Sequence, residues 1–202
     1  MRSSYGLLGL IYEVTFKVKP LQSMTLYHSS YSLDSFHKQL PALRARGDAM
    51  MMYVDPFTNL ITVEFRRYRR DEDPQKASSW QMKLRNFIWS RVAPYFSNIV
   101  TKYIPIKAIR YFLINRFNQV VIFFAVWVIH GKNILAPDQM IRFAEKPGDT
   151  KFTFSIWAFQ EEEYPRIQRA YFEFCREYYR SRGYRFNMMG EAYRINADTS
   201  AL

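Results

Sequence analysis

The sequence lacks the residue combinations on which most self-contained catalytic sites depend. Its 202 residues include one cysteine, Cys175, and three histidines. A single cysteine excludes an internal disulfide framework and is typical of a cytoplasmic protein. The histidines, His28, His37 and His130, have no metal-ligand spacing and no partner cysteines, so we predict no metal site.

The glycine-rich loops that cradle phosphates are also missing. No Gly-x-x-x-x-Gly-Lys occurs, no Gly-x-Gly-x-x-Gly follows a strand, and there is no serine-hydrolase elbow. No secretory signal opens the chain, since Met1–Ser4 leads directly into a glycine turn. The longest uncharged apolar run, Val120–Ile129, has ten residues, whereas a spanning helix needs about 20. We therefore expect neither an integral span nor catalysis built wholly from this chain.

Aromatic and basic residues are abundant instead. Aromatic residues make up 18% of the chain and hydrophobic residues 49%, which is far from a disordered composition. The length suits one domain, or one domain and a small part of another. The net charge is +11, from 29 Lys and Arg against 18 Asp and Glu. This charge permits binding to nucleic acid, anionic lipid or acidic ligands, and it selects none of them.

Hydrophobic periodicity predicts an α+β fold with a mixed or antiparallel sheet covered by helices. Ser32 is a typical helix N-cap and Gly47 a typical helix end, with Pro41 expected to kink or shorten the helix between them. The first half is expected to contain strands at Ser23–His28, Ala49–Val54 and Leu60–Tyr68, and a helix with Leu33, Phe36, Leu40 and Leu43 on one face.

The middle of the chain predicts helices and the tail predicts a β-β-α-β order. Trp80 to Asn118 reads as helical, with breaks expected at Pro94 and Pro105, while Val120–Ile129 fits either a helix or a buried strand. In the tail we expect strands at Gln139–Phe143, Phe152–Phe159 and Tyr184–Phe186, and a helix from Tyr164 to Gly183 with an apolar stripe of Ile167, Ala170, Tyr171, Phe174 and Tyr178.

The opening segment reads as a glycine turn that feeds one strand. Gly6 and Gly9 precede the aliphatic pair Leu10-Ile11, and the strand that follows ends near Lys19-Pro20-Leu21. This order resembles the closing segment of the FAD-binding domain in flavoproteins of the vanillyl-alcohol-oxidase type. Later segments resemble the substrate, or cap, region of FAD-linked sugar-acid lactone oxidases, a group that includes D-arabinono-1,4-lactone oxidase and alditol oxidase. These segments are Met50–Arg67, Pro137–Phe143, Phe152–Phe159, the Tyr164-Pro165 helix and Gly190–Leu202.

The resemblance implies FAD as cofactor and hydride transfer to the flavin from a sugar-derived alcohol or aldonolactone. It implies that residues 1–21 are the last strand of an otherwise missing FAD-binding domain. Residues 22–202 would form the cap domain, with a helical insert at about 80–130. The expected partners are a sugar-type substrate and the N-terminal FAD-binding half, without which the chain is expected to be inactive.

The resemblance also assigns site residues by position. Glycines let the backbone approach a cofactor closely, and the expected cofactor contacts are Gly6, Gly9, Leu10 and Ile11. The expected substrate contacts are Glu64, Arg66, Asp138, Gln139, Arg142, Tyr193 and Arg194.

A second reading comes from the basic, aromatic stretch Trp80–Arg116. Cations mixed with aromatic rings suit a membrane interface, and they also suit nucleic acid through stacking and phosphate contacts. The same pattern fits an ordinary helical insert whose cations face water. The alternative to the oxidoreductase is thus a non-enzymatic, basic peripheral-membrane or interaction module. We expect a cytoplasmic protein with peripheral membrane contact and no nucleic-acid partner.

Overall fold

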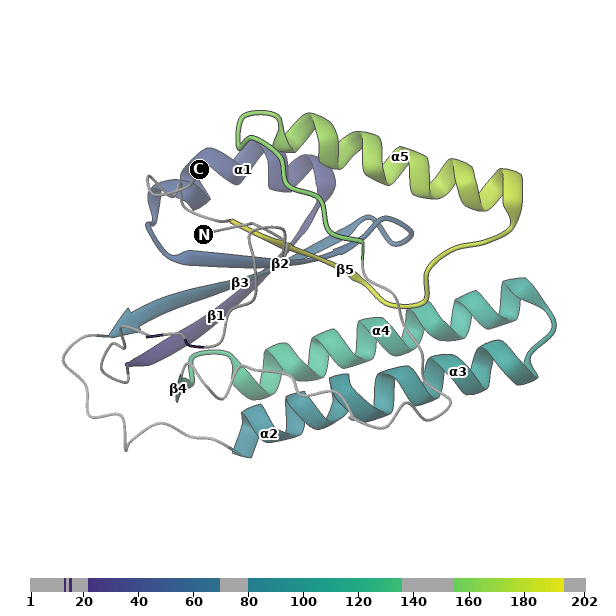
Figure 1. Ribbon diagram of the computed structural model, residues 1–202, viewed down its shortest axis with the longest axis horizontal. Helices are drawn as coiled ribbons and strands as arrows, with labels where there is room; N and C mark the ends of the chain where they lie inside the picture. The colour runs from purple at the N-terminus through teal and green to yellow at the C-terminus, as the bar shows by residue number, and fades with distance from the viewer. Residues whose placement is uncertain (1–12, 14, 16–21, 70–79, 136–154, 195–202) are drawn as a thin grey trace.

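The computed structural model describes residues 22–69, 80–135 and 155–194, together with Glu13 and Thr15. The described part is an α+β fold with a five-stranded antiparallel sheet in the order β4-β1-β3-β2-β5. Figure 1 shows the sheet between two helical layers, with α1 and α5 on one face and α2, α3 and α4 on the other. The predicted fold class is therefore correct at the level of an antiparallel α+β sheet.

The central strands are β1 (Ser23–Ser32), β2 (Ala49–Asp55) and β3 (Leu60–Arg69). Alternation along β3 sends Ile61, Val63 and Phe65 into one core, as predicted. Thr62, Glu64 and Arg66 are therefore on the opposite face. The two faces of the sheet thus differ in chemistry, because one is apolar and the other carries charge.

Helix α1 (Leu33–Ala45) begins where the sequence predicts. The Ser32 side chain accepts a hydrogen bond from the backbone N–H of Ser35, which satisfies one of the free donors of the first turn. Gly47 follows the helix with φ of +71°, which glycine adopts without strain. Of the two effects expected of Pro41, shortening does not occur, because the helix continues past it to Ala45.

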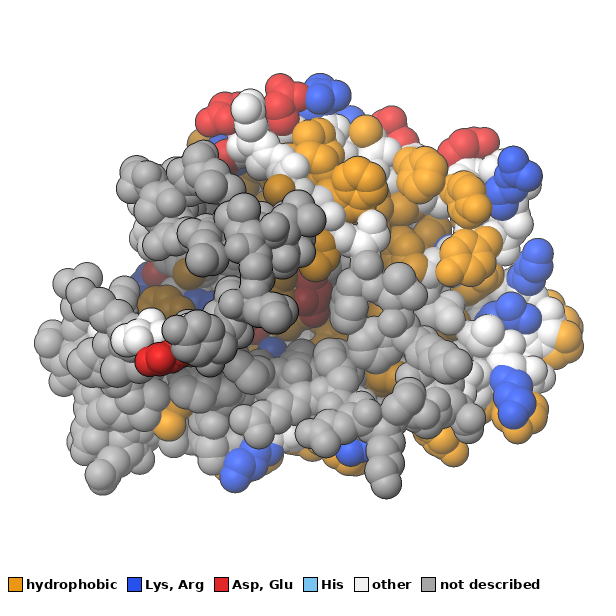
Figure 2. Space-filling model, in the orientation of Figure 1, with side chains coloured by type: hydrophobic (Ala, Val, Ile, Leu, Met, Phe, Trp, Pro, Cys, Tyr) orange, Lys and Arg blue, Asp and Glu red, His pale blue; other side chains and the backbone are white. Residues whose placement is uncertain are grey.

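Helix α5 (Tyr164–Arg182) packs on the same face of the sheet and ends at Gly183, whose φ is +64°. The predicted apolar stripe was wrong: Phe174 is 62% exposed, and Tyr171 and Tyr178 are also exposed. Phe172 and Cys175 are buried instead. Figure 2 shows hydrophobic side chains gathered over the surface of α5. Both faces of this helix carry aromatic residues, so periodicity alone does not identify the packed one.

The other helical layer contains α2 (Trp80–Phe87), the π-helical stretch η2 (Ile88–Val92), α3 (Ala93–Tyr103) and α4 (Lys107–Ile129). The chain breaks at Pro105, as predicted. Pro94 causes no break in the helical run, since it lies at the start of α3, directly after the π-helical stretch.

The Val120–Ile129 run belongs to helix α4 and not to a strand. By length and composition α4 is apolar enough to cross a membrane, with a mean hydropathy of 1.7 over its most apolar window, 28% of which is buried. The helix is longer than the uncharged apolar run because it also includes the polar residues before Val120, such as Arg110, Arg116 and Gln119.

The outer strands are β4 (Asn133–Leu135) and β5 (Gly190–Tyr193). The strand predicted at Tyr184–Phe186 was wrong, since the chain is irregular there and pairs with β2 only from Gly190. The Ser155–Phe159 part of a second predicted strand is also irregular. Of the predicted opening strand only Glu13 and Thr15 are described, and neither is assigned to a strand; the Gln139–Phe143 strand lies outside the described residues.

Candidate functional site

The charged face of the sheet carries a polar row that crosses four strands. His28 on β1 is in register with Glu64 on β3, which is in register with Met51 on β2 and through it with Tyr193 on β5. Residues in direct register point to the same face of a sheet. The register thus brings side chains from both halves of the sequence into one line.

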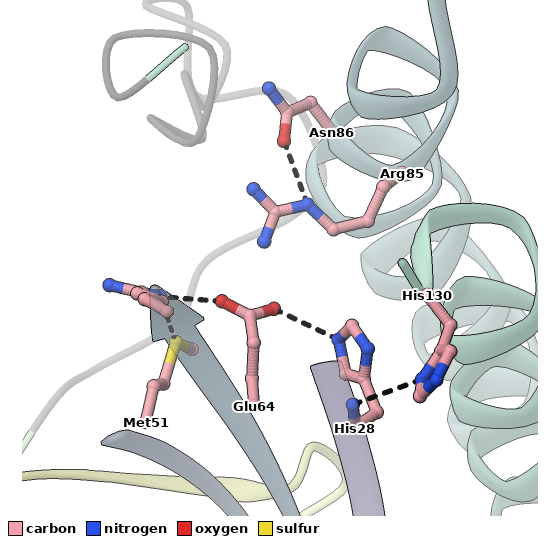
Figure 3. Close-up of polar contacts among 7 residues, drawn as sticks. His28, Met51, Glu64, Arg85, Asn86 and His130 are labelled. Carbon is pink, nitrogen blue, oxygen red and sulfur yellow. Dashed lines mark hydrogen bonds and ion pairs between the residues drawn. The ribbon is translucent and has the colours of Figure 1, made fainter. Parts of the chain in front are cut away.

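Glu64 is the centre of this cluster and is fully buried. One carboxylate oxygen lies 3.3 Å from His28 Nε2, and the other accepts a hydrogen bond of 2.8 Å from Arg66 Nε. Arg66 also donates through Nη2 to the Met51 sulfur at 2.7 Å. Figure 3 shows Glu64 held between the imidazole on one side and the guanidinium on the other.

These partners decide the charge of Glu64. Burial by itself would raise the pKa of the carboxyl group, but the hydrogen bond with His28 and the charge of Arg66 lower the pKa to about 2. Arg85 lowers the pKa further. Glu64 is therefore a buried carboxylate that stays ionised at neutral pH.

Helix α2 and the π-helical stretch η2 cover this row of side chains. Arg85 of α2 is buried and points toward the Glu64 carboxylate in Figure 3, with its Nε bonded to Asn86 Oδ1 at 3.1 Å. Tyr53, in the neighbouring row of the sheet, stacks on Trp89 of η2 with ring centroids 5.8 Å apart. Burial raises the pKa of Tyr53, and the nearby Glu64 raises it too, while Arg85 lowers it. Tyr53 is thus a neutral phenol beside the buried charges.

The ionised state of Glu64 determines the tautomer of neutral His28. A carboxylate only accepts hydrogen bonds, so the proton of a neutral imidazole is on Nε2, which faces Glu64. The lone pair is then on Nδ1, which is buried and has no hydrogen-bond partner among the described residues. The neighbouring His130 is engaged elsewhere, since its Nδ1 accepts from the backbone N–H of His28 at 3.1 Å. His28 Nδ1 is therefore a buried hydrogen-bond acceptor without a partner in the part of the chain that the structure describes.

Acid should weaken the fold through Glu64. The pKa of Glu64 in the folded protein lies below the ordinary value of 4.5. The stability that the ionised carboxylate contributes is therefore complete above about pH 4.5, and it is lost as the pH falls through about 2. The difference between these pKa values corresponds to roughly 3 kcal/mol. We expect wild-type protein to lose about this much more unfolding free energy between pH 4.5 and 2 than Glu64→Gln. Urea unfolding at a series of pH values measures the difference, and parallel curves for the two proteins would contradict it.

The structure brings three of the predicted site residues together. Glu64 and Arg66 are ion-paired, and the electrostatic influence of both reaches Tyr193, whose pKa is raised by burial and by its hydrogen bond with Glu191. Arg194 belongs to a different group, since strand alternation turns it toward Glu161, with which it forms an ion pair of 2.8 Å.

The remaining predicted contacts lie outside the described residues. These are Gly6, Gly9, Leu10, Ile11, Asp138, Gln139 and Arg142. Among the described residues, no group of three or more His, Cys, Asp or Glu side chains is arranged to hold a metal ion.

Sequence reasoning missed His28, Tyr53 and Arg85. His28 carried one usable signal, because strand alternation puts it on the face opposite Tyr27 and Tyr31, which pack against the apolar core. Nothing local links Arg85 to the sheet, since its approach depends on how α2 docks.

No known protein-family model matches this chain, and neither a curated protein nor a solved structure is significantly similar to it.

Proposed function

We propose that this chain is the substrate-binding part of an FAD-dependent oxidoreductase that oxidises a sugar-derived alcohol or aldonolactone. The observation that carries the proposal is the buried His28–Glu64 pair, in which His28 Nδ1 has no hydrogen-bond partner among the described residues. The sequence resemblance supplies the reaction class and the cofactor. The cluster supplies the groups that such a reaction needs from the protein.

Oxidation of an alcohol removes a hydride from carbon and a proton from the hydroxyl oxygen. His28 Nδ1 is the group that would accept a hydrogen bond from the hydroxyl and then its proton. The Glu64 carboxylate on Nε2 would stabilise the imidazolium that forms, as a carboxylate behind a catalytic histidine does. Arg66 would act as a positioning residue, because its ion pair holds the carboxylate in place.

FAD, when bound, would supply the hydride acceptor. The residues of the cluster suit the part of this chemistry that the protein would perform, because they include His28 as the base and Glu64 as a carboxylate that stays ionised. The residues that would contact the flavin are those of the opening glycine turn, Gly6 and Gly9 with Leu10 and Ile11.

Ligand binding by the intact chain tests the proposal without requiring the flavin. Polyols such as xylitol and sorbitol, and aldono-1,4-lactones, would be titrated by calorimetry and by saturation-transfer NMR. We expect at least one of them to bind, and His28→Asn to weaken that binding about 10-fold or more, because a buried polar contact is lost.

His37→Asn is the matched control. His37 also bonds a buried side chain, Gln168, at 2.8 Å, but it lies between α1 and α5 on the far side of the sheet. Its replacement should leave ligand affinity unchanged. Binding of no polyol or lactone, or equal losses in both histidine variants, would overturn the proposal.

A further inference from the structure

Helix α4 turns an apolar stripe away from the sheet. Its buried residues include Tyr111, Ile114 and Val121. A residue two positions away from a buried one lies on nearly the opposite side of the helix, because each residue turns it by about 100°. The side chains at these opposite positions are largely aromatic and exposed, with Phe123 and Trp127 about seven-tenths exposed. The stripe consists of Ile109, Phe112, Val120, Phe123, Phe124 and Trp127.

The preceding helices carry a second stripe. The continuous run of α2, η2 and α3 buries Met82, Trp89 and Ala93. Its exposed side is again apolar and aromatic, at positions three or four residues apart within each helix. This stripe consists of Trp80, Leu84, Phe87, Tyr95, Ile99 and Tyr103.

Both stripes point to the same side of the molecule. Trp89 and Ala93 from one helical run, and Val121 and Ile122 from α4, pack together on the sheet residues Met51 and Tyr53. The two runs therefore lie in one layer against one sheet face, as Figure 1 shows. Their opposite sides form one outer surface, which we call the aromatic face. Monomeric soluble proteins rarely leave so many large apolar side chains together in water.

The charge of this layer has a single sign. Residues 80–135 contain eight Lys and Arg and no Asp or Glu. Six of these cations are exposed, and none of the six forms an ion pair with a described residue. They are Lys83, Arg91, Lys102, Lys107, Arg116 and Lys132. Figure 2 shows basic and hydrophobic side chains side by side where α3 passes to α4.

We propose that the aromatic face docks on an anionic lipid surface. Exposed Trp, Tyr and Phe side chains suit the headgroup level of a bilayer, where an amphipathic ring has one apolar side and one wet side. The surrounding cations would meet the negative headgroups, and the lack of acidic residues removes the repulsion that such a surface would otherwise exert. The sheet-facing side of α4 is packed against Met51 and Tyr53, so the helix lies along the surface and does not cross it. This inference is independent of the proposed oxidoreductase.

Vesicle binding by the full chain tests the proposal. Co-sedimentation would compare vesicles of phosphatidylcholine with vesicles containing about one-third phosphatidylglycerol. We expect strong binding to the anionic vesicles only, weakening as salt is added. A triple variant, Arg91→Gln with Lys102→Gln and Arg116→Gln, should weaken binding about 100-fold. A double variant, Phe123→Ser with Trp127→Ser, should weaken it about 10-fold or more.

Matched controls come from helix α5, on the other side of the sheet. Phe174→Ser with Tyr178→Ser removes two exposed aromatic side chains there, and Arg169→Gln with Arg180→Gln and Arg182→Gln removes three exposed cations. Both variants should bind vesicles as the wild type does. All these positions are exposed, and circular dichroism checks that each variant is folded.

Insertion depth gives a direct readout. Lipids brominated near the headgroup should quench fluorescence from Trp127, so Trp127→Phe should reduce the quenching. Trp157, which is 75% exposed and belongs to neither stripe, is the comparison, and Trp157→Phe should leave the quenching as it was.

Several results would overturn the proposal. One is equal binding to neutral and anionic vesicles, and another is an equal loss in the α5 variants. Resistance to alkaline carbonate would make α4 a spanning helix instead. Tighter binding to a single-stranded oligonucleotide than to vesicles at the same salt would point to nucleic acid. A stable dimer that the Phe123 and Trp127 changes dissociate, without vesicle binding, would make the face an interface between copies of the chain.

Discussion

Replacing Glu64 with alanine is expected to destabilise the protein by about 3–5 kcal/mol. The carboxylate is fully buried between His28 and Arg66, and Arg85 is buried near it. Removing the carboxylate leaves the His28 imidazole and the Arg66 guanidinium without the partner that they share, and leaves Arg85 buried near them without the negative charge of Glu64. The loss is measured as the change in unfolding free energy in urea at neutral pH, where the wild-type carboxylate is ionised.

Glu161→Ala is the control for this prediction. Glu161 also pairs with two arginines, Arg44 at 2.9 Å and Arg194 at 2.8 Å, but its side chain is 40% exposed. Exposed ion pairs contribute only about 0–1 kcal/mol, because water screens them. If both alanine variants lose the same small amount of stability, the Glu64 cluster is solvated and the interpretation of its burial is wrong.

Replacing Phe172 with alanine is also expected to cost about 3–5 kcal/mol. Phe172 comes from α5 and is fully buried in the core that it shares with Phe36 of α1 and Phe65 of β3. Its removal leaves a cavity at the place where α1 and α5 pack on the sheet. Thermal and urea unfolding of the variant give the loss in stability.

Phe174→Ala is the matched control, because it removes the same side chain from the same helix two residues away. Phe174 is largely exposed, so its loss should change the unfolding free energy by no more than about 0.5 kcal/mol. A larger loss at Phe174 than at Phe172 would mean that α5 packs through its Tyr171, Phe174 and Tyr178 side after all.

The helical layer connects the two proposals made for this protein. Arg85 and Trp89 turn inward to the polar cluster, whereas Leu84 and Phe87 on the same helical run turn outward to the aromatic face. A layer of this kind would cover the candidate substrate site with one side and contact lipid with the other. The vesicle and ligand experiments address the two sides separately, since their variants share no residue.

Local features of the sequence predicted several elements of the fold correctly. The N-cap at Ser32, the helix end at Gly183 and the alternation of Ile61, Val63 and Phe65 were all correct. Each of these depends on atoms only a few residues apart, such as the Ser32 oxygen and the N–H of Ser35. Glu64 and Arg66 were likewise recognisable as one face of a strand, because alternation by itself puts them there.

The tertiary structure alone decided which faces meet. On α5 an aromatic pattern occurs on both sides, and only docking against Phe36 and Phe65 selects Phe172 for the core. Burial of the polar Gln168 on that side is offset by its bonds to His37 and Tyr164.

The candidate site shows the same division. The sequence by itself determined that Glu64 and Arg66 share a strand face and that a basic, aromatic helical segment follows. It did not determine that His28 and Arg85 approach Glu64, because strand register and helix docking join residues that are distant along the chain. Those contacts depend on the packing of the whole sheet between its two helical layers.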